Sequence, residues 1–146
     1  MPQQQQVRII NPYAPPAYNG MLDAAPAGYV DVDFKIPFDV VLTANQDAPN
    51  LARDVPTDAD FIWRATIANV QTGEYSIQFK DTQGYEFSNG LIHRINISAS
   101  AIAPSVNGHE IVIPAGGQIG IHMLDLSGFT NTIQILFLGV KRYKLS

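Results

Sequence analysis

The chain alternates between apolar and polar residues over much of its length, with a period of two residues. In VDVDFKI (30–36) apolar residues alternate with charged ones, and EYSIQFKD (74–81) repeats this pattern. A period of two is typical of a β-strand with one buried face. We therefore expect a half-buried strand in each segment. In the first segment the residues that share the apolar face are Val30, Val32, Phe34 and Ile36.

Further strands are predicted between breaks at Gly, Pro and Asn-Gly. FIWRATIANV (61–70) is one of them, with alternating faces that place Phe61, Trp63, Ala65 and Ile67 on one side. The segment TANQDAPNLARDVPTDAD (43–60) is expected to be a long irregular loop with a short helical turn near 50–54. About eight short strands at roughly regular spacing, without a convincing amphipathic helix, favour an all-β sandwich or barrel.

The last segment, NTIQILFLGVKRYKLS (131–146), is apolar on both faces. A strand with one solvated face would alternate. Two explanations fit this pattern. One face meets the core while the other meets a second subunit or the N-terminal arm, or the strand lies centrally within one domain. Phe137 and Leu138 are the residues expected to represent the two faces.

Residues 1–28 differ from the rest of the chain. MPQQQQ is of low complexity, and prolines at 12, 15, 16 and 26 disfavour a long helix or a central strand. We expect an extended arm here, followed by a β-sandwich domain over 29–146; a solvated tail is the alternative. Apolar residues are rare in solvated tails. Those that favour an arm contacting a neighbour are Val7, Ile9, Ile10, Tyr13 and Tyr18.

The composition of the chain limits the classes of partner that we expect it to bind. Charged residues make up 15% of the chain, against about 25% in an average soluble domain, so the surface is either neutral and polar or covered by a partner. A net charge of −4 argues against a nucleic-acid partner. The chain has no cysteine, no apolar run long enough for a membrane span and no signal-peptide pattern at its start. No membrane partner is expected.

No catalytic signature emerges, so we expect no enzyme activity, no cofactor and no metal. His93, His109 and His122 match no compact metal motif, although the last two flank a predicted turn and could approach one another. Four loop carboxylates could hold calcium, but the segment lacks the features of an EF-hand loop, which favours solvated side chains. These carboxylates belong to Asp47, Asp54, Asp58 and Asp60.

Two further groups of residues, one aromatic and one basic, are candidates for binding a ligand or a partner. Trp63, Tyr75 and Tyr85 are candidates for stacking on a carbohydrate, although aromatic residues in strands are more often part of the core. The basic end of the chain, from Lys141 to Lys144, suits either contact with an acidic neighbour or the protection of a strand edge.

Two stretches resemble the small structural proteins of tailed bacteriophages, of the capsid decoration or cement type. They are FIWRATIANVQTGEYSIQFKDTQGYEFSNGLIH and VIPAGGQIGIHMLDLSGFTNTIQILFLGVKRYKL, and together they cover about residues 60–145. The positions that carry the resemblance are Phe61, Trp63, Arg64, Asp81, Gly84 and the phrase from Ile133 to Tyr143.

The resemblance implies a jelly-roll-like antiparallel β-sandwich and a virion component made in the bacterial cytoplasm. It implies a homotrimer on the capsid surface that bridges copies of the major capsid protein. A head–tail or tail-fibre component and a carbohydrate-binding module are the alternatives. Together with the two-faced terminal strand, it makes the following residues candidates for the subunit interface: Phe137, Leu138, Arg142 and Tyr143.

Overall fold

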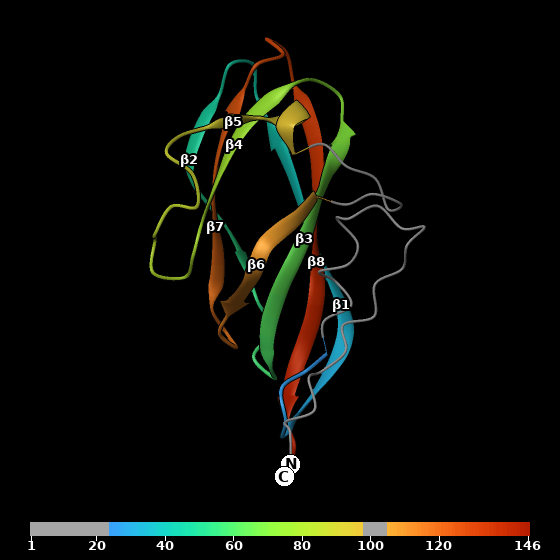
Figure 1. The fold of residues 1–146 in the computed structure, drawn as a ribbon. Coiled ribbons are helices and arrows are strands. Elements are labelled where there is room, and N and C mark those ends of the chain that lie inside the picture. The colour runs from blue at the N-terminus through green and yellow to red at the C-terminus, as the bar shows by residue number, and fades with distance from the viewer. Residues whose placement is uncertain (1–23, 98–104) are drawn as a thin grey trace, which may run out of the picture.

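A computed structural model of the 146-residue chain describes residues 24–97 and 105–146. Eight strands form two antiparallel four-stranded sheets (Figure 1), which confirms the prediction of an all-β sandwich. The arm residues named above lie outside the described residues. The strands are β1 (Tyr29–Leu42), β2 (Asp47–Asp54), β3 (Asp60–Gln71), β4 (Tyr75–Lys80), β5 (Ile92–His93), β6 (Ser105–Ile113), β7 (Gln118–Asp125) and β8 (Asn131–Lys144).

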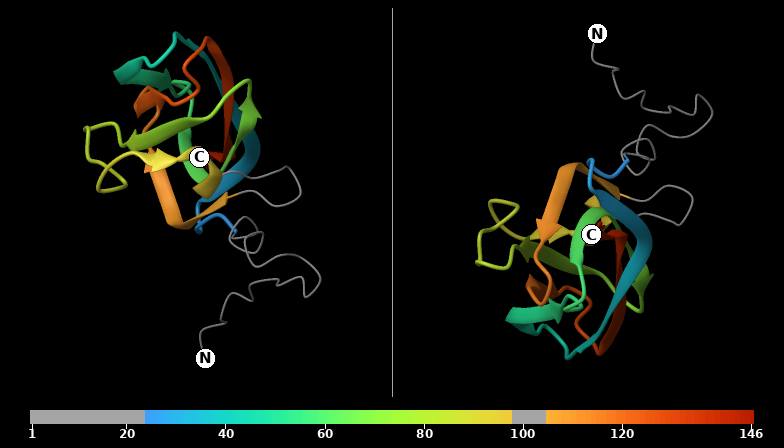
Figure 2. Two further views of the ribbon diagram at one scale, coloured as in Figure 1. Left: turned by 90° about the horizontal axis from the view of Figure 1, so that it is seen from above. Right: turned by 90° about the horizontal axis from the view of Figure 1, so that it is seen from below.

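The strand order is that of a jelly roll. One sheet, sheet A, has the order β1-β8-β3-β6, and the other, sheet B, has the order β2-β7-β4-β5. The antiparallel pairs are nested, because the first strand pairs with the last, the second with the seventh, the third with the sixth and the fourth with the fifth. Two stacked sheets with this nesting define the jelly-roll architecture, and the views along the sandwich show the sheets face to face (Figure 2).

The core lies between the two sheets and is centred on three aromatic rings. Trp63 of β3, Phe79 of β4 and Phe137 of β8 meet edge to face, with ring centroids 5.2 to 5.6 Å apart. The indole Nε1 of Trp63 donates hydrogen bonds to the carbonyl of Ala65 and the hydroxyl of Thr66, so its polar atom is satisfied within the core. This arrangement joins sheet A to sheet B through side chains that prefer edge-to-face contact.

Strand β2 was not predicted, because its residues do not alternate in the way that a strand requires. They occupy the segment expected to be an irregular loop with a helical turn, and that expectation is wrong. Strand β7 supplies the ladder partners, and the register shifts between Ala48 and Leu51. Pro49 falls at this shift, at the edge of the sheet, where a missing N–H costs no ladder hydrogen bond.

A bulge in β3 overturns the predicted alternation of its faces. The register of β3 against β8 shifts between Trp63 and Ala65. Since one inserted residue reverses every later position, Ala65 and Ile67 lie on the outer face rather than beside Trp63 in the core. β5 spans only two residues, and a 3-10 turn, η2 (Arg94–Asn96), follows it.

At one end of the sandwich, two buried polar residues join three loops. The carboxylate of Asp125 accepts hydrogen bonds from the backbone N–H groups of Asn45, Ser127 and Gly128 at 2.8 to 3.2 Å, and from the Ser127 hydroxyl at 2.6 Å. The side chain of Asn131 donates to this carboxylate at 3.1 Å and bonds the backbone of Gly73 in both directions. Burial alone would raise the pKa of Asp125, but these hydrogen bonds outweigh it and hold the pKa far below its usual range.

Candidate interaction surface

Strand β8 is buried on both faces, as predicted, and it lies inside sheet A between β1 and β3. Phe137 points into the core. Leu138 points outward and packs with Ala65 and Ile67 in a second apolar cluster, against which Leu136 also packs. Both side chains are therefore buried within their own chain, Phe137 at 0% and Leu138 at 5% exposure, so neither offers a partner a free apolar surface.

Next to this outer cluster, four charged side chains from four strands form one network across sheet A. The guanidinium of Arg142 in β8 binds both oxygens of Asp31 in β1, at 2.8 and 2.9 Å. Arg64 of β3 contacts Glu110 of β6 at 2.8 Å and Asp31 at 3.4 Å, and Arg142 reaches Glu110 at 3.3 Å. The strand order of sheet A is what places these alternating charges side by side.

This network explains the basic end of β8. The hydrogen bonds that Arg142 donates to Asp31 raise the pKa of Arg142, with Glu110 adding to the effect. Burial alone would raise the pKa of Glu110, but hydrogen bonds from Arg64 and Arg142 outweigh it and lower that pKa. Arg142 was predicted to lie at a subunit interface. The structure places it in an ion-pair network of its own chain.

Lys141 and Tyr143 lie on the inner face of β8 and share one carboxylate. The ammonium group of Lys141 is 3.0 Å from both oxygens of Asp58, and the Tyr143 hydroxyl donates to the same side chain at 2.7 Å. The ammonium group also sits 4.2 Å from the centroid of the Phe34 ring. This contact places a cation over an aromatic face, so the charge of Lys141 is matched within the chain.

At this end β1 and β8 extend past the end of sheet B (Figure 1), and beyond the pairing of Asp60 of β3 with Arg142 they form a two-stranded ribbon. The register pairs Val30 with Tyr143, and the backbone N–H of Leu145 donates to the carbonyl of Gly28. Val30, Val32 and Leu145 are 43, 50 and 57% exposed. We call Val30, Val32, Tyr143 and Leu145 the ribbon patch. The residues of the ribbon patch continue the inner face of β1 and β8, which is buried in the core further along these strands. At the ribbon patch no opposing sheet covers this face.

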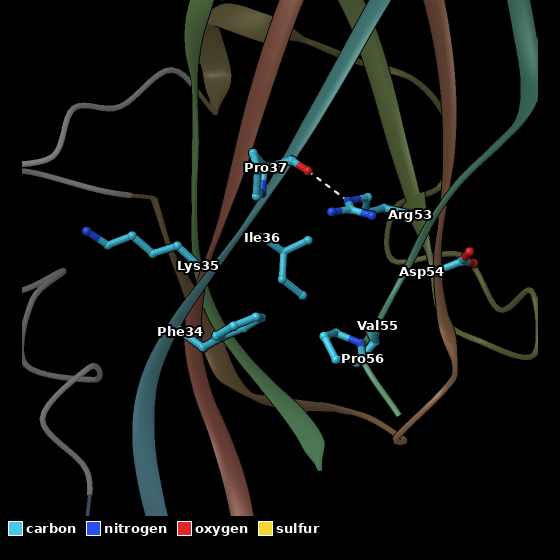
Figure 3. A pocket seen from close by; sticks show the side chains of 8 residues that line it. All are labelled: Phe34, Lys35, Ile36, Pro37, Arg53, Asp54, Val55 and Pro56. Atoms are coloured by element: carbon cyan, nitrogen blue, oxygen red, sulfur yellow. Dashed lines mark hydrogen bonds between the residues drawn. The ribbon is translucent and has the colours of Figure 1, made fainter. Parts of the chain in front are cut away.

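A groove continues from the ribbon patch between the edge strands of the two sheets, β1 and β2. It has a volume of about 320 Å³. Arg53 of β2 crosses it and donates from Nε to the carbonyl of Pro37 in β1 at 2.8 Å (Figure 3). The side chains that line it in Figure 3 are Phe34, Lys35, Ile36, Pro37, Arg53, Asp54, Val55 and Pro56.

The proposed carbohydrate-stacking surface does not form. Trp63 is 2% exposed and Tyr75 is fully buried, so neither ring can stack on a sugar. Tyr85 is exposed, in the loop between β4 and β5. Burial raises the pKa of the Tyr75 hydroxyl well above its usual value, and its oxygen lies 3.4 Å from the carbonyl of Ala68. Two of the three aromatic residues thus belong to the core.

The candidate metal ligands are also separated. His109 lies in β6 of sheet A and His122 in β7 of sheet B, so the strands that carry these two residues do not pair. His122 instead contacts Asp47 at 2.5 Å. Within 24–97 and 105–146, no group of three or more His, Asp or Glu residues is arranged to hold a metal ion. In the same ranges no helix is long and apolar enough to cross a membrane.

The other loop carboxylates each have a different partner. Asp54 accepts a hydrogen bond from the Gln118 side chain at 2.8 Å, and Asp60 accepts one from the backbone N–H of Ala115 at 2.9 Å. Asp58 binds the base of β8, as described above. These side chains therefore fasten strands and turns in separate places, and they form no shared calcium site.

Comparison with known proteins adds little. No family model matches the chain, and no curated protein matches it. Among solved structures, one matching chain comes from a structure described as "Bacillus endospore appendages form a novel family of disulfide-linked pili". The match has 12% identity and covers 84% of this chain and 97% of that one, with a TM-score of 0.30. A likeness at that TM-score carries no argument about this chain.

Proposed function

We propose that this protein is a structural subunit of a bacteriophage virion, a capsid decoration protein that assembles as a homotrimer and bridges copies of the major capsid protein. The observation that carries the proposal is the ribbon patch. Val30, Val32 and Leu145 present exposed apolar side chains on one face of a rigidly paired ribbon. Contiguous apolar surface of this kind marks a contact with another protein.

The surroundings of the ribbon patch support a contact between proteins rather than a small-molecule site. The patch is borne by strands β1 and β8, whose pairing continues without a register shift from Tyr29 to Leu42. The charges at its base are matched internally by Asp58, so a partner can cover it without burying an unpaired cation there. The sandwich acts as a preformed scaffold, which lowers the entropic cost of binding.

Several such contacts on one particle would give strong retention even if each contact is weak, because linked sites bind with a high effective concentration. This is the physical basis for a decoration protein that holds neighbouring capsid proteins together.

The first test is the mass of the purified protein by light scattering coupled to size exclusion. We expect a trimer of 16.0-kDa chains. Val30→Thr combined with Val32→Thr should convert it to a monomer, because both changes lower the apolar area while keeping a β-branched shape. The matched control combines Val41→Thr with Val70→Thr, at valines that are 59 and 56% exposed near the other end of the sandwich. This control should stay trimeric.

The second test is co-sedimentation with capsids assembled without decoration protein. The wild-type protein should sediment with them, and the double variant of the ribbon patch should remain in the supernatant. A monomeric wild-type protein that also fails to bind capsids would refute the proposal. Equal loss of binding in the patch variant and its control would show that the effect does not come from the ribbon patch.

A further inference from the structure

The outer edge of β1 is a row of backbone groups beside the groove described above. Within the described residues β1 pairs only with β8, so its other side is an edge of sheet A. Long edges of this kind can pair with another chain. On β1 the edge adjoins exposed apolar side chains of the ribbon patch, which gives an added strand something to cover.

The register identifies which groups face outward along this edge. In an antiparallel strand the N–H and C=O of one residue point to the same side, and the side alternates along the chain. Pro37 has no N–H, and its carbonyl accepts from Arg53 of β2 rather than from β8. Asp31, Asp33 and Lys35 lie at even spacings from Pro37, so they also direct their backbone groups away from β8.

The edge therefore has a defined usable length. The carbonyl of Pro37 is occupied by Arg53, which closes the edge at that point. At the other end, the N–H of Tyr29 donates to the carbonyl of Pro26 in the turn that leads into the strand. Between these two limits, residues 31–35 offer hydrogen-bonding groups to a short extended segment.

We propose that residues 7–10 of a second copy of this chain add to β1 as an extra strand along residues 31–35. The segment reads Val-Arg-Ile-Ile, and in an extended conformation Val7 and Ile9 share one face. Those two side chains cover the ribbon patch and the mouth of the groove. Strand addition of this kind gains affinity from main-chain hydrogen bonds and specificity from alternate side chains.

Charge complementarity determines which side chains of the added segment face the ribbon patch and which face outward. With Val7 and Ile9 turned toward the ribbon patch, Arg8 lies on the outer face of sheet A. On that face β1 presents both Asp33 and Lys35, which are exposed, so the favoured register sets Arg8 opposite Asp33. Opposite charges across neighbouring strands favour the pairing, whereas like charges disfavour it. The segment therefore carries both the apolar and the cationic side chain that this edge accepts.

The composition and length of the linker between residues 10 and 29 favour addition to a second copy rather than to the same chain. Eighteen residues separate Ile10 from Tyr29, and four of them are proline. An extended chain rises about 3 Å per residue, so a linker of this length is long enough, at about 50 Å, to reach a second subunit. Head-to-tail addition between copies then closes into a ring or continues as a fibre.

The inference rests on the self-association in the proposed function, and it identifies β1 as the strand that accepts the added segment. Because the chain has no cysteine, cross-linking can test it directly. A tagged Arg8→Cys protein is mixed with an untagged Asp33→Cys or Lys35→Cys protein and oxidised. Residues opposite one another on paired strands lie about 5 Å apart, within disulfide range. We expect the mixed disulfide dimer to form with at least one of these two partners.

The matched control is Val41→Cys, on the same strand and face but beyond Pro37. The yield of mixed dimer with this control should be at least about tenfold lower. A variant with both Arg8→Cys and Asp33→Cys tests whether the pairing is within one chain. A cross-link formed inside a single chain in that variant would overturn the proposal, and so would equal mixed-dimer yields at 33, 35 and 41.

Lys35→Pro separates this inference from the proposed function. It removes one outward N–H while leaving the β1–β8 ladder intact, so the monomer should fold and self-association should weaken about tenfold. A variant that still forms the wild-type trimer would overturn strand addition, while the loss of trimer on changing Val30 and Val32 would leave the ribbon patch as the interface.

Discussion

Replacing Asp125 with Asn should destabilise the fold strongly, although the two side chains have almost the same shape. The carboxylate accepts five hydrogen bonds, and every one of its partners is a donor. One oxygen faces the N–H groups of Asn45 and Gly128, and the other faces Ser127 and Asn131. An amide must therefore point its own N–H groups at donors in either orientation.

The magnitude follows from these contacts. Hydrogen bonds to a charged group contribute about 1.5–3 kcal/mol each, and a buried group left without a partner costs about 1–3 kcal/mol. At least two donors lose their acceptor, and water can reach part of the loop. We therefore expect a loss of about 3–4 kcal/mol in the free energy of unfolding. Three loops separated in sequence would lose their common anchor.

The assay is urea denaturation followed by tryptophan fluorescence, which reports on the single buried Trp63. The matched control is Asp39→Asn, since Asp39 is exposed and accepts one hydrogen bond, from Gln134, at 2.9 Å. That change should alter stability by less than about 0.5 kcal/mol. If the Asp125 variant lies within 1 kcal/mol of wild type, the carboxylate does not anchor the loops and the reasoning fails.

The same residue predicts a dependence on pH. The folded state holds the pKa of Asp125 far below its value in the unfolded chain, which is about 3.9. A depressed pKa contributes stability that is present above the unfolded value and is lost as the pH falls toward the folded value. The difference in stability between wild type and the Asn variant should therefore shrink as the pH is lowered below about 4.

Three further changes test other parts of the fold. Phe137→Ala should cost about 3–5 kcal/mol in urea denaturation, because it empties the centre of the aromatic core. Gly139→Ala should prevent soluble expression, since a Cβ there would collide with the backbone carbonyl of Ile62, whereas alanine at Gly84, where no atom lies within 4 Å, should cost only about 1–2 kcal/mol through its positive φ and leave the protein soluble. Arg142→Lys should lower stability by about 1–2 kcal/mol, because lysine keeps the charge but loses the two-pronged contact with Asp31, and normal stability of this variant would show that charge alone suffices.

The sequence by itself determined the class of fold and the faces of its regular strands. A period of two and frequent breaks predicted an all-β sandwich, and the doubly apolar end of the chain predicted a strand covered on both sides. Both predictions are confirmed for the described residues, because alternation is a local property that each strand carries in its own side chains. The jelly-roll order followed only from the resemblance to known structural proteins.

Tertiary structure decided everything that depends on a distant partner. β2 is a strand because β7 lies beside it, and its own residues carry no such signal. The bulge at Arg64 reversed the later positions of β3, which no alternation of residue types reveals. Val30 and Phe34 share one face of β1, yet Phe34 packs against the core while Val30 is exposed.

The charged residues show the same limit. Arg142 and Asp31 are 111 positions apart in the chain, and Asp125 and Asn45 are 80 apart, so no spacing along the sequence could connect them. The basic end of β8 had two open interpretations in the sequence. The folded chain pairs Arg142 with Asp31, because the nested strand order brings the first strand beside the last, and it pairs Lys141 with Asp58. Local patterns set which faces a strand has, and the topology alone sets what each face meets.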